Sequence, residues 1–161
     1  MSGFFFAFLA VALASIGARD QITLARLVNR NGPNTALLVL ACLCACAASA
    51  FAAWAGSTIA PGMTPNARSF LAALALGWAG AESLLLTPGR KPEEPTRSLG
   101  AASVVLLAHQ LTDAARFLIF ALAVAFNAPP AAGLGGATAS VAMLATAFAL
   151  PEYCEWQTLR W

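Results

Sequence analysis

The chain has 161 residues, of which 60% are hydrophobic and only 10% are charged, and its formal net charge is +2. A soluble domain carries roughly a quarter charged residues, so this composition excludes an ordinary soluble domain. It indicates an integral membrane protein whose partner is the lipid bilayer. No cluster of basic residues points to nucleic acid as a partner.

Five apolar segments follow one another along the chain, each with the length of a membrane-spanning helix. They run over residues 4–28, 35–55, 67–86, 99–126 and 131–150. Turn-forming or polar residues separate them, and the clearest hydrophilic loop covers residues 87–98. We therefore predict an all-α, polytopic membrane protein that forms a single transmembrane domain over residues 1–161.

The positions of lysine and arginine predict how the spans are oriented, since cytoplasmic loops carry an excess of both. With five spans, the first loop, the third loop and the tail lie on one side of the membrane. They hold most of the basic residues, namely Arg26, Arg30, Arg90, Lys91, Arg97 and Arg160. This bias places the N-terminus outside the cytoplasm, as in a multi-pass protein of a bacterial inner membrane.

The first and fourth segments then run in opposite directions, and each carries a polar patch near its midpoint. Two inverted units of three helices are a common plan of transporters, with the site between the units near the midplane. We expect residues 3–86 to form the first unit and residues 98–161 the second. We expect the last helix of the second unit to be short or missing: either the chain ends early, or a homo- or hetero-oligomeric partner supplies the sixth helix.

The two polar patches predict the site, because ionisable groups within a membrane span are expensive and usually functional. Carboxylate, amide and hydroxyl oxygens suit Mn²⁺, Ca²⁺ or Mg²⁺, and a carboxylate can also carry a proton. The predicted cation or proton site consists of Asp113, Asp20, Gln110, Gln21, Ser15 and Thr112. Asp113 and Asp20 are its metal ligands.

A second interpretation is structural and uses the same charges. If the two helices cross, Asp20 meets Arg116 and Asp113 meets Arg19, and the pairs cancel as buried locks. His109 would then be a packed, hydrogen-bonded partner. Glu82 is predicted to be an interfacial carboxylate and Trp78 a packing residue.

Small residues predict two helix contact faces, because they let helices approach closely in lipid. One face is Gly77, Gly80 and Ala81, and the other is Gly133, Gly136 and Ser140. Four cysteines, Cys42, Cys44, Cys46 and Cys154, are interpreted as small apolar residues, with a soft-metal site or a redox pair as the alternative.

The chain resembles the Gdt-type membrane proteins, whose two inverted three-helix repeats each carry Glu-x-Gly-Asp-(Lys/Arg)-(Thr/Ser), often followed by Gln. In SIGARDQ, Gly17, Arg19 and Gln21 match this motif, and Ser15 stands in place of the Glu. In QLTDAAR, Asp113 matches, and Gln110 stands in place of the Glu. The stretch EEPTRSLGA also looks like the central linker of the family.

The resemblance implies a divergent exchanger of Mn²⁺ or Ca²⁺ for protons, with the metal as cargo and no permanently bound cofactor. The alternative is a non-transporting scaffold or partner subunit that keeps the fold. One histidine, no Ser-Lys or paired-Asp arrangement and no metal motif argue against an enzyme.

Overall fold

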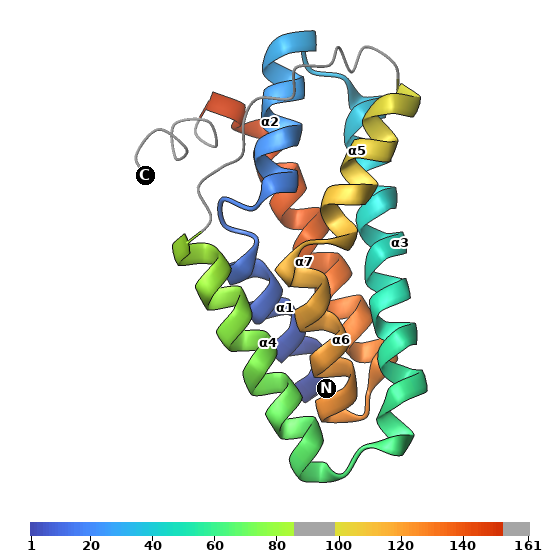
Figure 1. The fold of residues 1–161 in the computed structure, drawn as a ribbon. Helices are drawn as coiled ribbons and strands as arrows, with labels where there is room; N and C mark the ends of the chain where they lie inside the picture. The colour runs from blue at the N-terminus through green and yellow to red at the C-terminus, as the bar shows by residue number, and fades with distance from the viewer. Residues whose placement is uncertain (86–98, 153–161) are drawn as a thin grey trace.

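The computed structural model describes residues 1–85 and 99–152 (Figure 1). Over these residues the protein consists of helices joined by short connections and contains no strand, which confirms the predicted all-α class. The helices are α1 (Ser2–Ala14), α2 (Arg19–Asn31), α3 (Thr35–Ile59), a short 3₁₀ helix η1 (Ala60–Gly62), α4 (Pro65–Leu85), α5 (Leu99–Leu111), α6 (Ala114–Phe126) and α7 (Pro129–Ala149).

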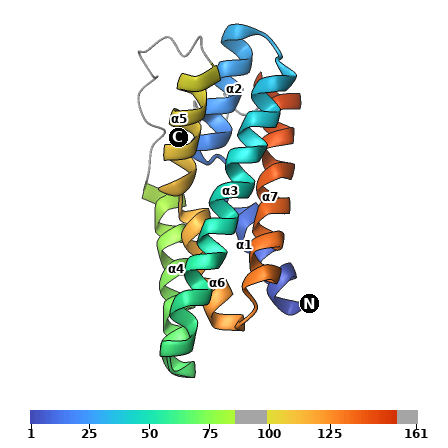
Figure 2. The same cartoon turned by 90° about the vertical axis from the view of Figure 1, so that its right-hand side faces the viewer.

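The first and fourth apolar segments are each broken into two helices, and the expectation that each is continuous was wrong. α1 and α2 meet at an angle of 58°, and α5 and α6 meet at 50°. The two breaks lie at the same level of the bundle (Figures 1 and 2). The α1–α2 pair runs upward in Figure 1 and the α5–α6 pair runs downward, so the two broken segments are antiparallel, as predicted.

Two of the described helices are long and apolar enough to cross a membrane. They are the α3–η1 helix, Thr35–Gly62, and α7, Pro129–Ala149. The number rises to four if each broken pair counts as one span. α4 is not among these helices, so the structure supports a membrane protein with two to four such spans where the sequence predicted five.

α7 packs most extensively on α1 and α3. Its glycines make this close approach possible. A Cβ atom added at Gly133 would lie 2.9 Å from the Cβ of Ala53 on α3, and one added at Gly135 would overlap the backbone of Phe4 on α1. The predicted contact face on this helix is confirmed, since Gly133, Gly136 and Ser140 are all buried.

α4 lies at the edge of the bundle and packs mainly on α6, with a small contact to α1. It turns Ala75 and Ala79 inward, whereas Phe70 and Leu74 are exposed. The predicted contact face on this helix was wrong, because Gly77 and Gly80 are exposed and a Cβ atom at either position would meet nothing within 4 Å.

Candidate functional site at the two helix breaks

The first break separates α1 from α2 and places an acidic residue at the start of α2. α1 ends at Ser15, and Gly17 has a φ of +75°, a backbone conformation that glycine adopts without steric penalty. Ala18 is extended, and α2 begins at Arg19. Asp20 therefore lies in the first turn of α2, where the positive end of the helix dipole stabilises a carboxylate.

The second break separates α5 from α6 without a glycine, and it also places an aspartate at the start of a helix. Thr112 follows α5, and its hydroxyl donates to the carbonyl of Ala108 at 2.9 Å. Asp113 has an extended backbone and is the N-cap of α6, a position at which aspartate is strongly preferred. Both breaks thus present an aspartate at the N-terminus of a half-helix.

The breaks bring Asp20, Asp113 and Arg116 into one cluster, although 93 residues separate the two aspartates (113 − 20). Each carboxylate lies within electrostatic range of the other and of the Arg116 guanidinium. Asp20 is 6% exposed and Arg116 is 4% exposed. Asp20 and Arg116 thus act on each other electrostatically, as the predicted pair requires, but no hydrogen bond joins them.

The predicted meeting of Asp113 with Arg19 was wrong. Arg19 is exposed, and the charges that act on Asp113 are those of Asp20, Arg116 and Glu82. Glu82 is half-buried, and its charge acts on Asp113. Arg19 points elsewhere because it is adjacent to Asp20, and neighbouring residues project about 100° apart around a helix.

Arg116 is held by α7 and not by either aspartate. Its Nη1 donates to Oγ of Ser140 at 2.8 Å. Its Nε and Nη2 are buried and have no hydrogen-bond partner, and the same is true of Asp113 Oδ2. Each unpaired buried polar group costs roughly 1–3 kcal/mol of stability. Leaving these three atoms without hydrogen-bond partners is therefore unfavourable for the folded protein.

Gln21 ties the first break to α7. Its Oε1 accepts a hydrogen bond from the backbone N–H of Gly17 at 3.1 Å, and its Nε2 donates to the carbonyl of Met143 at 3.0 Å. The backbone N–H of Gln21 also donates to Asp20 Oδ1 at 2.7 Å. The amide of Gln21 therefore stabilises the fold, while it was predicted to assist a bound cation.

The side-chain amide of Gln110, unlike that of Gln21, is only partly hydrogen-bonded. It is fully buried, and its Nε2 donates to the carbonyl of Ala41 on α3 at 3.3 Å. Its Oε1 has no hydrogen-bond partner. This amide oxygen keeps its capacity to accept a hydrogen bond, and its predicted role as a cation ligand stays a prediction.

His109 joins the two broken helices through a threonine. Its Nδ1 lies 3.2 Å from Thr23 Oγ1, and the single hydroxyl proton of Thr23 goes to the carbonyl of Arg19 at 2.6 Å. The imidazole Nδ1 is therefore the donor to Thr23. This contact agrees with the packed, hydrogen-bonded partner predicted for His109.

The predicted hydroxyl ligands are less well placed. Thr112 is exposed and its hydroxyl already donates to its own helix, while Ser15 is buried at the end of α1. Within residues 1–85 and 99–152, no group of three or more His, Cys, Asp or Glu side chains is arranged to hold a metal ion. Cys42, Cys44 and Cys46 are free thiols, and Cys154 lies outside the described residues.

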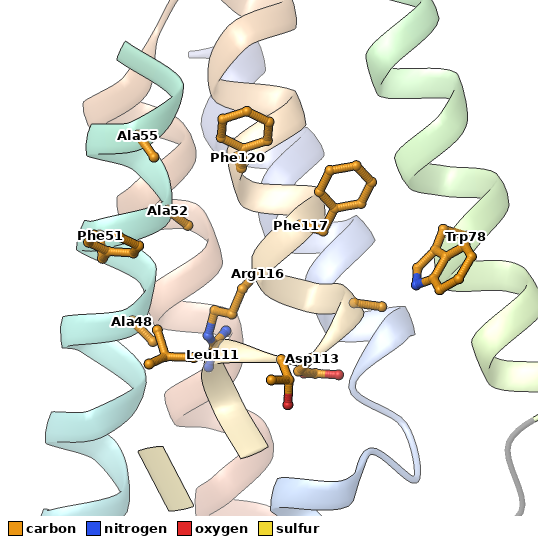
Figure 3. Close-up of a pocket in the computed structure, with 12 residues that line it drawn as sticks. Ala48, Phe51, Ala52, Ala55, Trp78, Leu111, Asp113, Arg116, Phe117 and Phe120 are labelled. Atoms are coloured by element: carbon orange, nitrogen blue, oxygen red, sulfur yellow. The ribbon is translucent and has the colours of Figure 1, made fainter. Parts of the chain in front are cut away.

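A groove of about 270 Å³ reaches this cluster from the side of the bundle where α4 stands away from α3 (Figure 3). Asp113, Thr112 and Arg116 provide its polar part. The remaining lining is apolar and comes from α3, α4, α5 and α6: Ala48, Phe51, Ala52, Ala55, Trp78, Leu111, Ala114, Phe117 and Phe120. Trp78 is 65% exposed and lines this groove, so its prediction as a packing residue was wrong.

Comparison of the chain with protein-family models, with curated proteins and with solved structures found no match. The site is therefore interpreted from its own geometry.

Sequence reasoning missed the groups that hold the cluster in place. Ser140 was noticed only as a small residue, yet it fixes Arg116. The carbonyl of Met143 and the aromatic walls Phe117 and Phe120 carry no signal in the sequence that separates them from other apolar residues. Only the presence of a buried arginine at position 116 indicated that a distant hydroxyl or carbonyl would be needed.

Proposed function

We propose that the chain is a multi-pass membrane transporter that exchanges a cation for a proton, with Asp113 as the exchanging carboxylate. The observation that carries this proposal is the meeting of two antiparallel broken helices, which places Asp113 and Asp20 in one cluster that a groove reaches. Broken helices near a midplane site are a recurring feature of secondary transporters. The inverted plan of the two halves belongs to the same proposal.

The charges of the cluster support a division of labour between the two carboxylates. Asp20 and Arg116 are both almost fully buried and of opposite charge, so they neutralise each other to a first approximation. Asp113 lines the groove and keeps one unpartnered oxygen. Asp113 is then the group that binds either a proton or the cation, with Gln110 Oε1 as a further oxygen ligand.

The cation that the Gdt-type resemblance implies is Mn²⁺ or Ca²⁺. The described residues offer two carboxylates and one unpaired amide oxygen, which are hard ligands suited to these ions. The nearby Arg116 lowers the affinity of the cluster for a dication by electrostatic repulsion. We therefore expect weak binding of the metal, as a carrier that must release its cargo requires.

A scaffold function is the second candidate, and one observation favours it. Gln21 and Arg116 both bond directly to α7, so the polar residues at the breaks also lock three helices together. A protein that used the cluster only in this way would keep its fold and move no ion.

Transport by the purified full-length protein in sealed lipid vesicles tests the proposal. With an imposed pH gradient, added Mn²⁺ or Ca²⁺ should drive a proton flux that protein-free vesicles lack. Replacing Asp113 by Asn keeps the shape of the side chain and removes its charge, and should reduce this flux at least tenfold. Glu152→Gln is the matched control, because Glu152 is exposed and lies after α7, and its substitution also removes one negative charge.

The two candidate functions give different results in this assay. The absence of metal-coupled proton flux from the wild-type protein, or an equal flux from Asp113→Asn, would contradict exchange. If the wild-type protein is inactive and Asp113→Asn is less stable than Glu152→Gln, the scaffold function is supported.

A further inference from the structure

The guanidinium of Arg116 makes a hydrogen bond through Nη1, whereas its Nε–Nη2 edge makes none. Nη1 is bound to Ser140, whereas Nε and Nη2 are buried without partners. Nε and Nη2 share one edge of the planar group and point their N–H bonds in parallel, which is the geometry that grips a carboxylate with two hydrogen bonds. Ser140 orients the group so that this edge stays free.

Asp113 contributes an acceptor without a partner to the same groove. Asp113 precedes Arg116 by one helical turn, its Oδ2 is buried without a partner, and both residues line the same groove. Figure 3 shows the two side chains at the α5–α6 break, below the aromatic rings of Phe117 and Phe120. The groove thus presents a carboxylate and a guanidinium edge beneath an apolar wall.

These unsatisfied groups restrict the chemistry of a ligand. A simple anion would satisfy Arg116 and leave Asp113 unpaired, and it would be repelled by the carboxylates of both Asp20 and Asp113. A simple cation would satisfy Asp113 and leave the edge of Arg116 unpaired. A molecule that carries both an ammonium and a carboxylate satisfies both groups at once, so the burial of charge is compensated on both sides.

The walls and the size of the groove restrict the rest of the molecule. Phe51, Trp78, Phe117 and Phe120 supply aromatic surface, which favours an apolar group on the ligand. The volume of about 270 Å³ lies just below the range of typical ligand pockets, which is roughly 300–1,000 Å³. A small molecule of amino-acid size fits this volume.

We propose that the groove binds a small zwitterion with an apolar side group, of the class of aliphatic α-amino acids. The carboxylate of the ligand lies on the Nε and Nη2 edge of Arg116, its ammonium lies on Asp113, and its side group lies against Phe117 and Phe120. The inference rests on the proposed role of Asp113 as the cation-binding carboxylate, and it names an organic ammonium, in place of the metal ion, as that cation. Its test is a binding measurement that requires no transport.

Three probes with the same branched apolar group test the proposal on the wild-type protein in detergent. Leucine carries both charges, leucinamide lacks the carboxylate, and 4-methylpentanoate lacks the ammonium. Titration calorimetry should show saturable binding of leucine, with leucinamide and 4-methylpentanoate each at least tenfold weaker. Because the protein is unchanged in this comparison, a folding defect cannot produce the difference.

Two variants then assign the charges to their residues. Arg116→Lys keeps the positive charge and can still donate to Ser140, but it loses the two-pronged edge, so it should weaken leucine binding at least tenfold and leave leucinamide binding unchanged. Asp113→Asn should weaken leucine binding and leave 4-methylpentanoate binding unchanged or stronger. Glu152→Gln is the control and should bind all three probes as the wild type does.

Three results would overturn the proposal: no saturable binding of leucine at millimolar concentration, equal binding of the three probes, or leucine binding that survives both substitutions. The outcome is separable from that of the vesicle assay. Leucine binding without metal-coupled proton flux would support the zwitterion site and contradict metal exchange. Metal-coupled flux without leucine binding would do the reverse.

Discussion

Arg116 and Ser140 are joined by a 2.8 Å hydrogen bond that ties the start of α6 to α7. Replacing Ser140 by Ala removes the only hydrogen-bond partner found for this guanidinium among the described residues. We expect the free energy of unfolding to fall by about 1–2 kcal/mol, because a buried charged donor loses its acceptor. Thermal or chemical unfolding in detergent measures the change.

Thr138→Ala is the control for this prediction, since the hydroxyl of Thr138 is exposed and donates to carbonyls of its own helix. The change should be within about 0.5 kcal/mol. Equal effects of the two substitutions would show that the bond to Arg116 does not stabilise α7.

The two glutamines at the breaks should respond differently to replacement by Met, a side chain of similar length. Gln21→Met removes hydrogen bonds to Gly17 and to the carbonyl of Met143, so we expect a loss of about 1–3 kcal/mol. Gln110→Met removes one long hydrogen bond to Ala41 and also an oxygen that has no partner, so the loss should stay below about 1 kcal/mol. Unfolding of both variants under the same conditions makes the comparison, and a larger loss for Gln110→Met would contradict it.

Replacing glycine by alanine should have opposite signs on α7 and on α4. A Cβ atom at Gly135 would overlap the backbone of Phe4, which cannot move aside as a side-chain end can, so Gly135→Ala should destabilise by about 1–3 kcal/mol. At Gly77 the added methyl group meets nothing within 4 Å, and Ala favours a helix over Gly by roughly 1 kcal/mol. Gly77→Ala should therefore raise the midpoint of thermal unfolding, and a rise for Gly135→Ala would contradict the close packing of α1 on α7.

Asn127 ends α6 with a φ of +48°, in the left-handed region. Asn127→Gly should leave stability within about 0.5 kcal/mol of the wild type, because glycine adopts this conformation freely. Asn127→Val should lower it by about 1–2 kcal/mol, since a β-branched residue is strained there. Asn66→Val, at an exposed position of α4, controls for the loss of the amide, and a loss as large as that of Asn127→Val would show that backbone strain is not the cause.

The sequence predicted the helices well because the apolar segments have clear ends. The segments at residues 35–55, 67–86 and 131–150 correspond to α3, α4 and α7 within a few residues. The breaks were not predicted, although the residues that cause them were noticed. A single Gly17 or Asp113 inside an apolar run is compatible with a continuous helix, and tertiary packing decides which conformation it adopts.

The sequence predicted the charged residues of the candidate site but not the residues that contact them. Unusual charged residues identify themselves in an apolar background, so Asp20, Asp113 and Arg116 could be selected from the sequence. Their partners could not, because Ser140 and Trp78 are ordinary residues whose side-chain directions depend on how α7 and α4 pack.

Among the described segments, α3 and α7 pass the level of the two breaks without interruption, and they pack against each other. A continuous helix resists bending because its hydrogen-bond ladder would have to open, whereas the two joints beside it have no such ladder to lose. The architecture thus combines two continuous, rigid helices, α3 and α7, with two broken helices that can act as hinges. A relative rotation of the halves would bend the chain at the two breaks, and it would change the spacing between Asp20 and Asp113, which lie at these breaks.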